Sequence, residues 1–248
     1  FHEIELFQRH KNKISSKIIS IKRVKFQNTS IKKKIKQDLK KITSIRKNFL
    51  NSINFTNTSI MGILNLTPDS FSDGGKFNSK NKSFQHISRM IKSGANIIDI
   101  GGESTRPGSL KVTTEQEWKR VKHVIKNFRK KFGKNLFSID TRKSKIMLKA
   151  LEHKVNLIND VSGFNYDLQA LDKIKRFKIP KVLHHMQGTP NTMQKNPKYK
   201  NVLLDIYDYF EEGIKKIGDK KILLDPGIGF GKNLKHNLTL ISKISLFH

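Results

Sequence analysis

The amino-acid sequence predicts an α/β protein: a TIM-type (β/α)8 barrel that follows a basic N-terminal extension. Six short apolar runs alternate with segments whose apolar residues recur at helical spacing, which is typical of a parallel sheet with helical crossovers. Polar residues follow the ends of at least five of these runs, and a (β/α)8 barrel builds its site from the loops at that edge. A doubly wound sheet would instead gather its site at one switch point.

The first 57 residues differ in composition from the rest of the chain. They hold three acidic residues, no glycine and no proline, while Lys and Arg recur throughout. Apolar residues within 31–45 are spaced as in a basic amphipathic helix. We therefore predict two parts. Residues 1–57 form a Lys-rich extension that is poorly ordered or loosely helical, and residues 58–248 form the barrel.

The composition limits the classes of function. The 248 residues include 50 Lys and Arg against 20 Asp and Glu, a net charge of +30. The Lys residues are spread along the whole chain and form no single basic face with interleaved aromatics, so codon bias explains them better than a nucleic-acid partner. No run of about 18 apolar residues predicts a membrane span, and the absence of cysteine excludes disulfides and thiolate zinc sites. We expect a cytoplasmic protein.

The six apolar runs are expected to be strands of the barrel, in chain order. They span residues 59–65, 96–101, 136–141, 156–161, 181–186 and 221–226. Segments 115–131 and 202–217 are the clearest helices between them. After the sixth run the sequence passes through one helix and ends at His248. We therefore expect about six of the eight βα units in this sequence and the last two outside it.

The first two strand ends carry groups suited to a phosphate. Residues 65–75 combine an amide, two carboxylates, a proline and a glycine pair, which offers hard oxygen ligands for Mg²⁺ on a mobile loop. After the second strand, Arg106 is flanked by the hydroxyls of Ser104 and Thr105 and by free backbone N–H groups, which together can hold a diphosphate. Either segment taken alone could also be a polar loop that caps a helix.

Three later strand ends each carry one acid or amide: Asp140, Asn159 and Asp225. Such a group points into the mouth of a barrel, where desolvation is costly unless a ligand supplies hydrogen bonds. A carboxylate there can accept two N–H bonds from a 2-amino-4-oxo ring such as guanine. Each residue alone could be a helix cap, but three on separate strands favour a binding site. The glycines within 227–231 suggest close backbone approach to a flat ring, with Phe230 packed on it.

Four segments resemble, in order and at the same spacing, those of the dihydropteroate synthase family. They are residues 61–75, 94–108, 185–190 and 224–232. The resemblance covers about residues 58–245. It implies a (β/α)8 barrel, usually a homodimer, that acts as a transferase in folate biosynthesis. Such an enzyme condenses 6-hydroxymethyl-7,8-dihydropterin diphosphate with p-aminobenzoate and releases diphosphate.

The resemblance also assigns roles to single residues. Asn65 and Asp73 would bind Mg²⁺ and diphosphate, and the groups expected in catalysis are Asn65, Arg106 and Asp140. The remaining residues would form the substrate pockets: Thr105 and Arg106 at the diphosphate, Phe71 and Pro107 at p-aminobenzoate, Asp140, Asn159 and Asp225 at the pterin edge, and Val161, Met186 and Phe230 along the pterin pocket. In this family diphosphate is thought to leave first, and the arylamine attacks the resulting pterin carbocation. Mg²⁺ and Arg106 would stabilise the departing charge as it develops.

The sequence departs from the family pattern in two places. His184 stands where the family more often has Met, and we interpret it as a histidine of the pocket or core. The family's pterin-contacting lysine and the Arg-x-His of its last strand are expected outside the sequence, so the activity of this chain alone is an open question. Two alternatives are a pterin-binding methyltransferase barrel, which would not need residues 104–108, and a pterin-binding fragment without activity.

Overall fold

The computed structural model describes residues 2–10, 13–44, 48–50, 53, 57–67, 79–106 and 108–247. The chain divides into two units, one at Phe1–Lys47 and the other at Asn48–Phe247. We describe each unit separately. No helix within the described ranges is both long enough and apolar enough to cross a bilayer.

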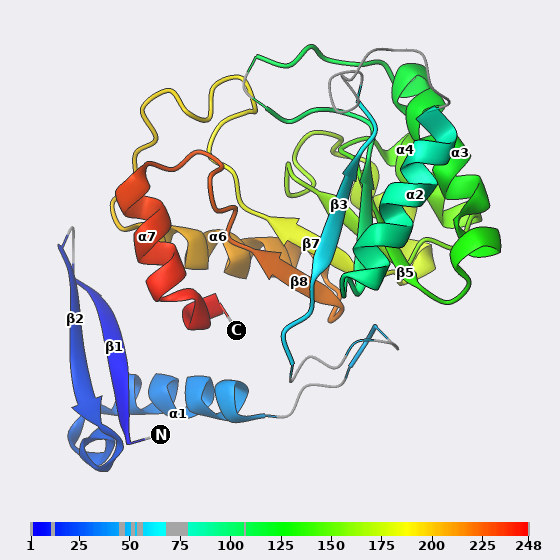
Figure 1. Cartoon of the computed structure of the whole chain (residues 1–248). Coiled ribbons are helices and arrows are strands. Elements are labelled where there is room, and N and C mark those ends of the chain that lie inside the picture. The colour runs from blue at the N-terminus through cyan, green and yellow to red at the C-terminus, as the bar shows by residue number, and fades with distance from the viewer. Residues whose placement is uncertain are drawn as a thin grey trace. The chain divides into compact units, whose positions relative to one another are not determined.

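The first unit contains a hairpin and a helix (Figure 1). Strands β1 (Glu3–His10) and β2 (Lys13–Ser20) pair antiparallel, and the 3-10 helix η1 (Ile21–Phe26) leads into helix α1 (Thr29–Thr43). The Asn28 side chain accepts a hydrogen bond from the Ile31 backbone N–H and caps α1. A small apolar cluster joins the hairpin to the helix: Ile4, Leu6, Ile19, Val24, Ile31, Ile35 and Leu39.

This arrangement differs from the poorly ordered or loosely helical extension expected for residues 1–57. The apolar side chains of the hairpin alternate with polar ones, and this gives it one face that can pack against the apolar stripe of α1. The boundary also lies at Lys47 and not at residue 57. Leu50 and Ile53 belong to the second unit because they pack against its sheet.

The second unit is built on a six-stranded parallel sheet whose strand order follows the chain, β3-β4-β5-β6-β7-β8. The strands are β3 (Met61–Asn65), β4 (Ile97–Gly101), β5 (Leu136–Asp140), β6 (Leu157–Asp160), β7 (Lys181–His184) and β8 (Ile222–Asp225). All six predicted runs are therefore strands, each shorter than predicted by one or two residues. Sequential order with parallel pairing is the topology of a (β/α)8 barrel, and six of its βα units lie within the described residues.

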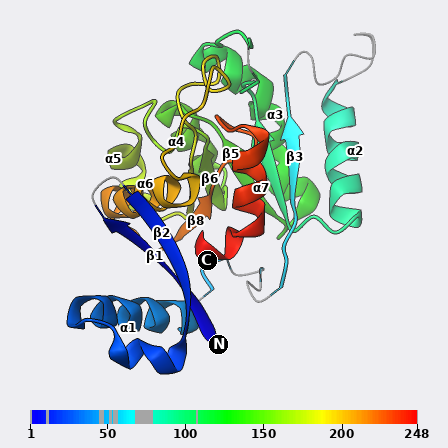
Figure 2. The same cartoon turned by 90° about the vertical axis from the view of Figure 1, so that its left-hand side faces the viewer.

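Helices follow the strands and surround the sheet in both views (Figures 1 and 2). They are α2 (Ser79–Lys92), α3 (Thr114–Phe132), α4 (Ser144–Glu152), α5 (Ala170–Ile174), η3 (Lys175–Phe177), α6 (Val202–Ile217), α7 (Leu234–Ser242) and η4 (Ile244–Phe247). The predicted helices 115–131 and 202–217 correspond to α3 and α6. A capping box of Thr113 and Gln116 begins α3, and Gly218, at a φ of 64°, ends α6 in the left-handed conformation.

The two faces of the sheet bury different side chains because successive residues of a strand point to opposite sides. The outer face is apolar and packs under the helices, with Leu64, Ile98, Ile100, Phe137, Ile139 and Ile158 buried in one cluster. The inner face is apolar only near the amino ends of the strands. There, a second cluster contains Leu50, Ile53, Ile97, Leu136, Leu157 and Val182. Polar residues hold the inner positions at the carboxyl ends, and this edge carries the site.

Candidate active site

Polar side chains form a row across the carboxyl ends of β3 to β6. The register pairs Asn65 with Gly101, Gly101 with Asp140, and Asp140 with Asn159. Gly101 makes room between its neighbours: a Cβ there would lie 3.2 Å from Asn65 Oδ1 and 3.1 Å from Asp140 Oδ2. The amide of Asn65 and the carboxylate of Asp140 therefore face the same space on either side of a residue without a side chain. Three predicted site residues are thus brought together.

Asp99 lies one layer below this row and holds one of its members, Asn159. The Ser138 hydroxyl donates to Asp99 Oδ1 at 2.5 Å, and the Asn159 Nδ2 group donates to Asp99 Oδ2 at 2.9 Å. Because the Asn159 amide nitrogen is taken, its Oδ1 points away from Asp99. That oxygen is buried and has no hydrogen-bond partner among the described residues. It is an acceptor available to an N–H group of a ligand.

The inner carboxylates repel one another. Burial, and next the charge of Asp99, raises the pKa of Asp140 well above its usual range. Burial also raises the pKa of Asp99, although the hydrogen bonds from Ser138 and Asn159 oppose this effect. A ligand that brings N–H donors or positive charge would relieve the repulsion. The electrostatics therefore favour a ligand with several hydrogen-bond donors on one edge.

Asp225 closes the other side of the site, at the end of β8. Its Oδ1 accepts a hydrogen bond from the Gly227 backbone N–H at 2.8 Å, and its Oδ2 lies 2.9 Å from His184 Nδ1. Burial by itself would raise the pKa of Asp225, but the contacts with His184, the Gly227 backbone N–H and the charge of Lys232 together outweigh it, and the pKa is lowered. Asp225 is therefore an ionised acceptor, and its side chain is 45 % exposed to the mouth of the barrel.

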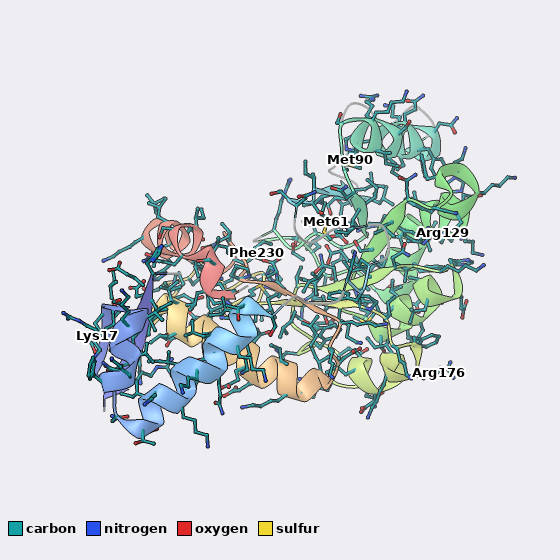
Figure 3. The ribbon with its side chains drawn as sticks, turned by 90° about the horizontal axis from the view of Figure 1, so that it is seen from below. Lys17, Met61, Met90, Arg129, Arg176 and Phe230 are labelled. Carbon is teal, nitrogen blue, oxygen red and sulfur yellow. The ribbon has the colours of Figure 1, made fainter. Side chains whose placement is uncertain are left out.

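The turn after β8 is fixed by Lys232. Its ammonium group donates to the Phe230 carbonyl oxygen at 2.8 Å and lies 3.2 Å from His185 Nδ1. Gly227, at a φ of 67°, adopts a conformation that favours glycine, and a Cβ there would meet the His185 carbonyl oxygen at 2.0 Å. These contacts hold half-buried Phe230 beside β7. In Figure 3, Phe230 lies on the segment between β8 and α7.

Two residues predicted to line the pterin pocket follow β6 and β7. Val161, directly after β6, is buried, and Met186, two residues beyond the end of β7, is half-buried. Asp160 fixes the turn after β6, because its carboxylate accepts hydrogen bonds from the backbone N–H groups of Ser162 and Phe164. Burial raises the pKa of this carboxyl to about 6.

The loop after β4 is anchored by a buried ion cluster. Glu103 accepts hydrogen bonds from Arg142 and from Lys143, each with a nitrogen at 2.9 Å, and Lys143 Nζ also lies 2.6 Å from Glu117 Oε2. The cluster joins this loop to α3 and to the loop after β5. It holds the base of the segment on which Thr105 is half-buried and Arg106 is exposed.

Three predicted site residues, Phe71, Asp73 and Pro107, lie outside the described residues. Within the described ranges there is no group of three or more acidic or histidine side chains that could hold a metal. Asn65, at the exposed end of β3, still offers a hard oxygen ligand. This fits Mg²⁺, which often takes only one or two protein ligands and completes its shell with phosphate oxygens and water.

We expect His185 to make the fold sensitive to acid. Burial, and next the charge of Lys232, lowers the pKa of this imidazole to about 3, whereas the unfolded chain has the ordinary value of 6.5. The unfolded state therefore binds more protons below pH 6.5, and stability falls as the pH is lowered toward 3. Between pH 6.5 and 4.5 this one group should remove about 2–3 kcal/mol.

Urea unfolding of the wild type and of His185→Asn at pH 7 and pH 4.5 measures this contribution. Asn keeps an acceptor for Lys232 and cannot be protonated. The difference in unfolding free energy between the two pH values should be smaller in the variant by about 2–3 kcal/mol. An identical pH dependence in both proteins would show that His185 is not held neutral by the fold.

A parallel α/β barrel with acids and amides gathered at the carboxyl ends of its strands is the architecture of a barrel enzyme. A family model described as pterin binding enzyme matches residues 61–248. The dihydropteroate synthase of Escherichia coli K12 is 42 % identical over 202 residues, which cover 79 % of this chain and 71 % of that protein. The corresponding enzyme of Bacillus subtilis is 40 % identical over 195 residues, 77 % of this chain and 66 % of that one.

Solved structures agree with the sequence comparison. The Yersinia pestis dihydropteroate synthase in complex with a sulfonamide drug aligns with a TM-score of 0.72 at 40 % identity, over 77 % of this chain and 71 % of that chain. The Xanthomonas albilineans enzyme with 4-aminobenzoic acid aligns with a TM-score of 0.69 at 34 % identity, over 77 % of this chain and 69 % of that chain. The chain belongs to the dihydropteroate synthase family of pterin-binding transferases.

Proposed function

We propose that the chain binds 6-hydroxymethyl-7,8-dihydropterin diphosphate and condenses it with p-aminobenzoate to form 7,8-dihydropteroate and diphosphate. The observation that carries this proposal is the set of inward acceptors at the carboxyl ends. Asp225 is ionised and partly exposed, and Asn159 Oδ1 is buried without a partner among the described residues. A pterin presents N–H donors along one edge of a flat ring, which is the complement of such a set.

The chain's own residues have distinct tasks in this reaction. Asp225 and Asn159 bind the pterin edge, and Phe230, Val161 and Met186 form the apolar walls of its pocket. In this proposal, the carbon that bears the diphosphate lies toward the loop after β4. There, Arg106 is exposed and free to meet the leaving group. A guanidinium at that point stabilises charge that develops only as the bond to diphosphate breaks, and so it lowers the barrier.

Mg²⁺ is part of the same proposal. Asn65, with Asp73, would hold the ion against the diphosphate, where it would neutralise part of the negative charge of the leaving group. A homodimer, which the resemblance to the family implies, and a cytoplasmic location, which the composition favours, belong to the proposal as well.

An assay of both products tests the reaction. The chain is incubated with pterin diphosphate, p-aminobenzoate and Mg²⁺, and dihydropteroate and diphosphate are measured together. Equal amounts of both products, formed only when both substrates are present, are expected. Pterin binding without any dihydropteroate would refute the proposed activity and favour a non-catalytic pterin-binding role for this chain.

Asn65→Ala separates the metal site from the pterin pocket. Asn65 lies beside Gly101 and not beside Asp225, so its loss should weaken Mg²⁺-dependent binding of the pterin diphosphate by about tenfold. Binding of 6-hydroxymethyl-7,8-dihydropterin, which lacks the diphosphate, should change by less than about twofold. The control is Asn135→Ala, at the amino end of β5. Equal losses for the two ligands would mean that Asn65 shapes the barrel and holds no ion.

A further inference from the structure

His184 is the last residue of β7 and faces the inside of the sheet. The register pairs it with Asp225 on β8, and only 3 % of its surface is exposed. Its ring stands edge-on to Phe230, with centroids 4.8 Å apart and an interplanar angle of 84°. The Tyr209 hydroxyl donates to the His184 carbonyl oxygen at 2.9 Å. Both the backbone and the ring of His184 are therefore held in place.

The Asp225 carboxylate is held from two sides. Its Oδ1 is bound to the Gly227 backbone N–H, and its Oδ2 lies 2.9 Å from His184 Nδ1. Each carboxylate oxygen has a second lone-pair site, so one acceptor position remains on each. With both oxygens fixed, the plane of the carboxylate is fixed as well. The two remaining acceptor positions then point in defined directions.

The other nitrogen of the His184 ring takes no part in ligand binding. Nε2 is buried and has no hydrogen-bond partner in the described part of the chain, and a Cβ at Gly227 would lie only 3.0 Å from it. An ionised Asp225 can only accept, so Nδ1 carries the hydrogen and Nε2 carries a lone pair. A protonated Nε2 would be a buried donor without an acceptor, which is costly. Any influence of His184 on a ligand must therefore pass through Asp225.

We propose that His184 is a positioning residue that aligns the Asp225 carboxylate with the N–H groups of the pterin. This inference rests on the proposed function, because it takes Asp225 to be the acceptor for the pterin edge. It also gives a role to the departure from the family, since the Met more often found at this position cannot donate a hydrogen bond. This chain fixes the carboxylate with a donor of its own.

Two substitutions separate the donor from the bulk of the side chain. His184→Met fills the space but donates nothing. His184→Asn keeps an N–H donor near the position of Nδ1. The dissociation constant of 6-hydroxymethyl-7,8-dihydropterin should rise about tenfold in His184→Met and stay within about threefold of the wild type in His184→Asn.

A double-mutant cycle with Asp225→Asn tests whether His184 acts through the carboxylate. In the Asp225→Asn background, His184→Met should weaken pterin binding by less than about twofold, because the group it aligns is gone. A full tenfold loss in that background would assign His184 to pocket packing and overturn the inference. If the wild type and His184→Met bind the pterin equally, the inference about His184 is wrong, while the proposed function is unaffected. A wild type that binds no pterin would overturn both.

One readout needs neither a ligand nor a variant. In ¹⁵N–¹H spectra of the histidine side chains of the folded chain, His184 should show the hydrogen on Nδ1. A hydrogen on Nε2 and none on Nδ1 would remove the donor to Asp225 and contradict the inference directly.

Discussion

Asp225→Asn is expected to lower the affinity for a pterin by about 2–4 kcal/mol, because one acceptor of the site is replaced by a donor that faces the N–H groups of the ligand. The same change disturbs the contact with His184 Nδ1, which would then face a neutral partner. Titration of the wild type and the variant with 6-hydroxymethyl-7,8-dihydropterin gives the difference directly.

Asp172→Asn is the matched control, since this acid lies exposed on α5 and away from the carboxyl ends of the strands. It should bind the pterin as the wild type does. If Asp225→Asn also keeps the wild-type affinity, the pterin edge is bound elsewhere and the assignment of Asp225 is wrong.

Glu103→Gln is expected to destabilise the fold by about 3–5 kcal/mol, because it removes the carboxylate paired with buried Arg142 and leaves Lys143 only its second partner, Glu117. The side chains of Arg142 and Lys143 are each 10 % exposed and that of Glu103 is 6 % exposed. Burial alone would raise the pKa of Glu103, but hydrogen bonds from these two cations lower it. The carboxylate therefore stabilises the fold fully above pH 4.5, which is its pKa in the unfolded chain. This contribution is lost as the pH falls through its lower pKa in the folded chain.

The chain offers an exposed ion pair for comparison. Glu211 lies 3.7 Å from Lys215 on α6, with side chains 52 % and 71 % exposed. Glu211→Gln should change the unfolding free energy by less than about 1 kcal/mol, as surface pairs usually do. Urea unfolding at pH 7 compares the two variants. A Glu103→Gln protein as stable as Glu211→Gln would mean that the cluster of Glu103, Arg142 and Lys143 does not anchor the loop after β4.

The strands, the helices between them and most of the inner row could be predicted from the sequence. Each strand is a short apolar run, and parallel strands bring their carboxyl ends to one edge, so Asn65, Asp140, Asn159 and Asp225 were expected to meet there. No three-dimensional information was needed for that step. The family resemblance then supplied the identity of the ligand, which the strand pattern alone does not give.

Two features of the site could not be predicted in the same way. Asp99 lies two residues before Gly101 in an apolar run, so the alternation of side chains along a strand places it on the inner face. Its hydrogen bond with Asn159, however, depends on the stagger between strands, which the sequence does not show. The contact of His184 with Asp225 likewise depends on the register of β7 and β8. Sequence spacing sets which face a residue occupies, whereas register sets its neighbour.

The first unit escaped prediction for another reason. Its hairpin residues alternate weakly among many Lys residues, and two-stranded hairpins are only marginally stable alone. The hairpin is stabilised by its packing on α1, through Ile19, Val24 and Ile35. The roles of Phe71, Asp73 and Pro107, which lie outside the described residues, stay predictions from the family resemblance.

The most direct test of a pterin site at this edge compares two ligands that differ by one group. 6-Hydroxymethyl-7,8-dihydropterin and its analogue without the 2-amino group are titrated into the wild-type chain under the same conditions. If Asp225 accepts hydrogen bonds from the pterin edge, the analogue leaves a buried acceptor unpaired and should bind at least about tenfold more weakly. Equal affinity for the two ligands, or no binding of either, would contradict a pterin site at the carboxyl ends of these strands.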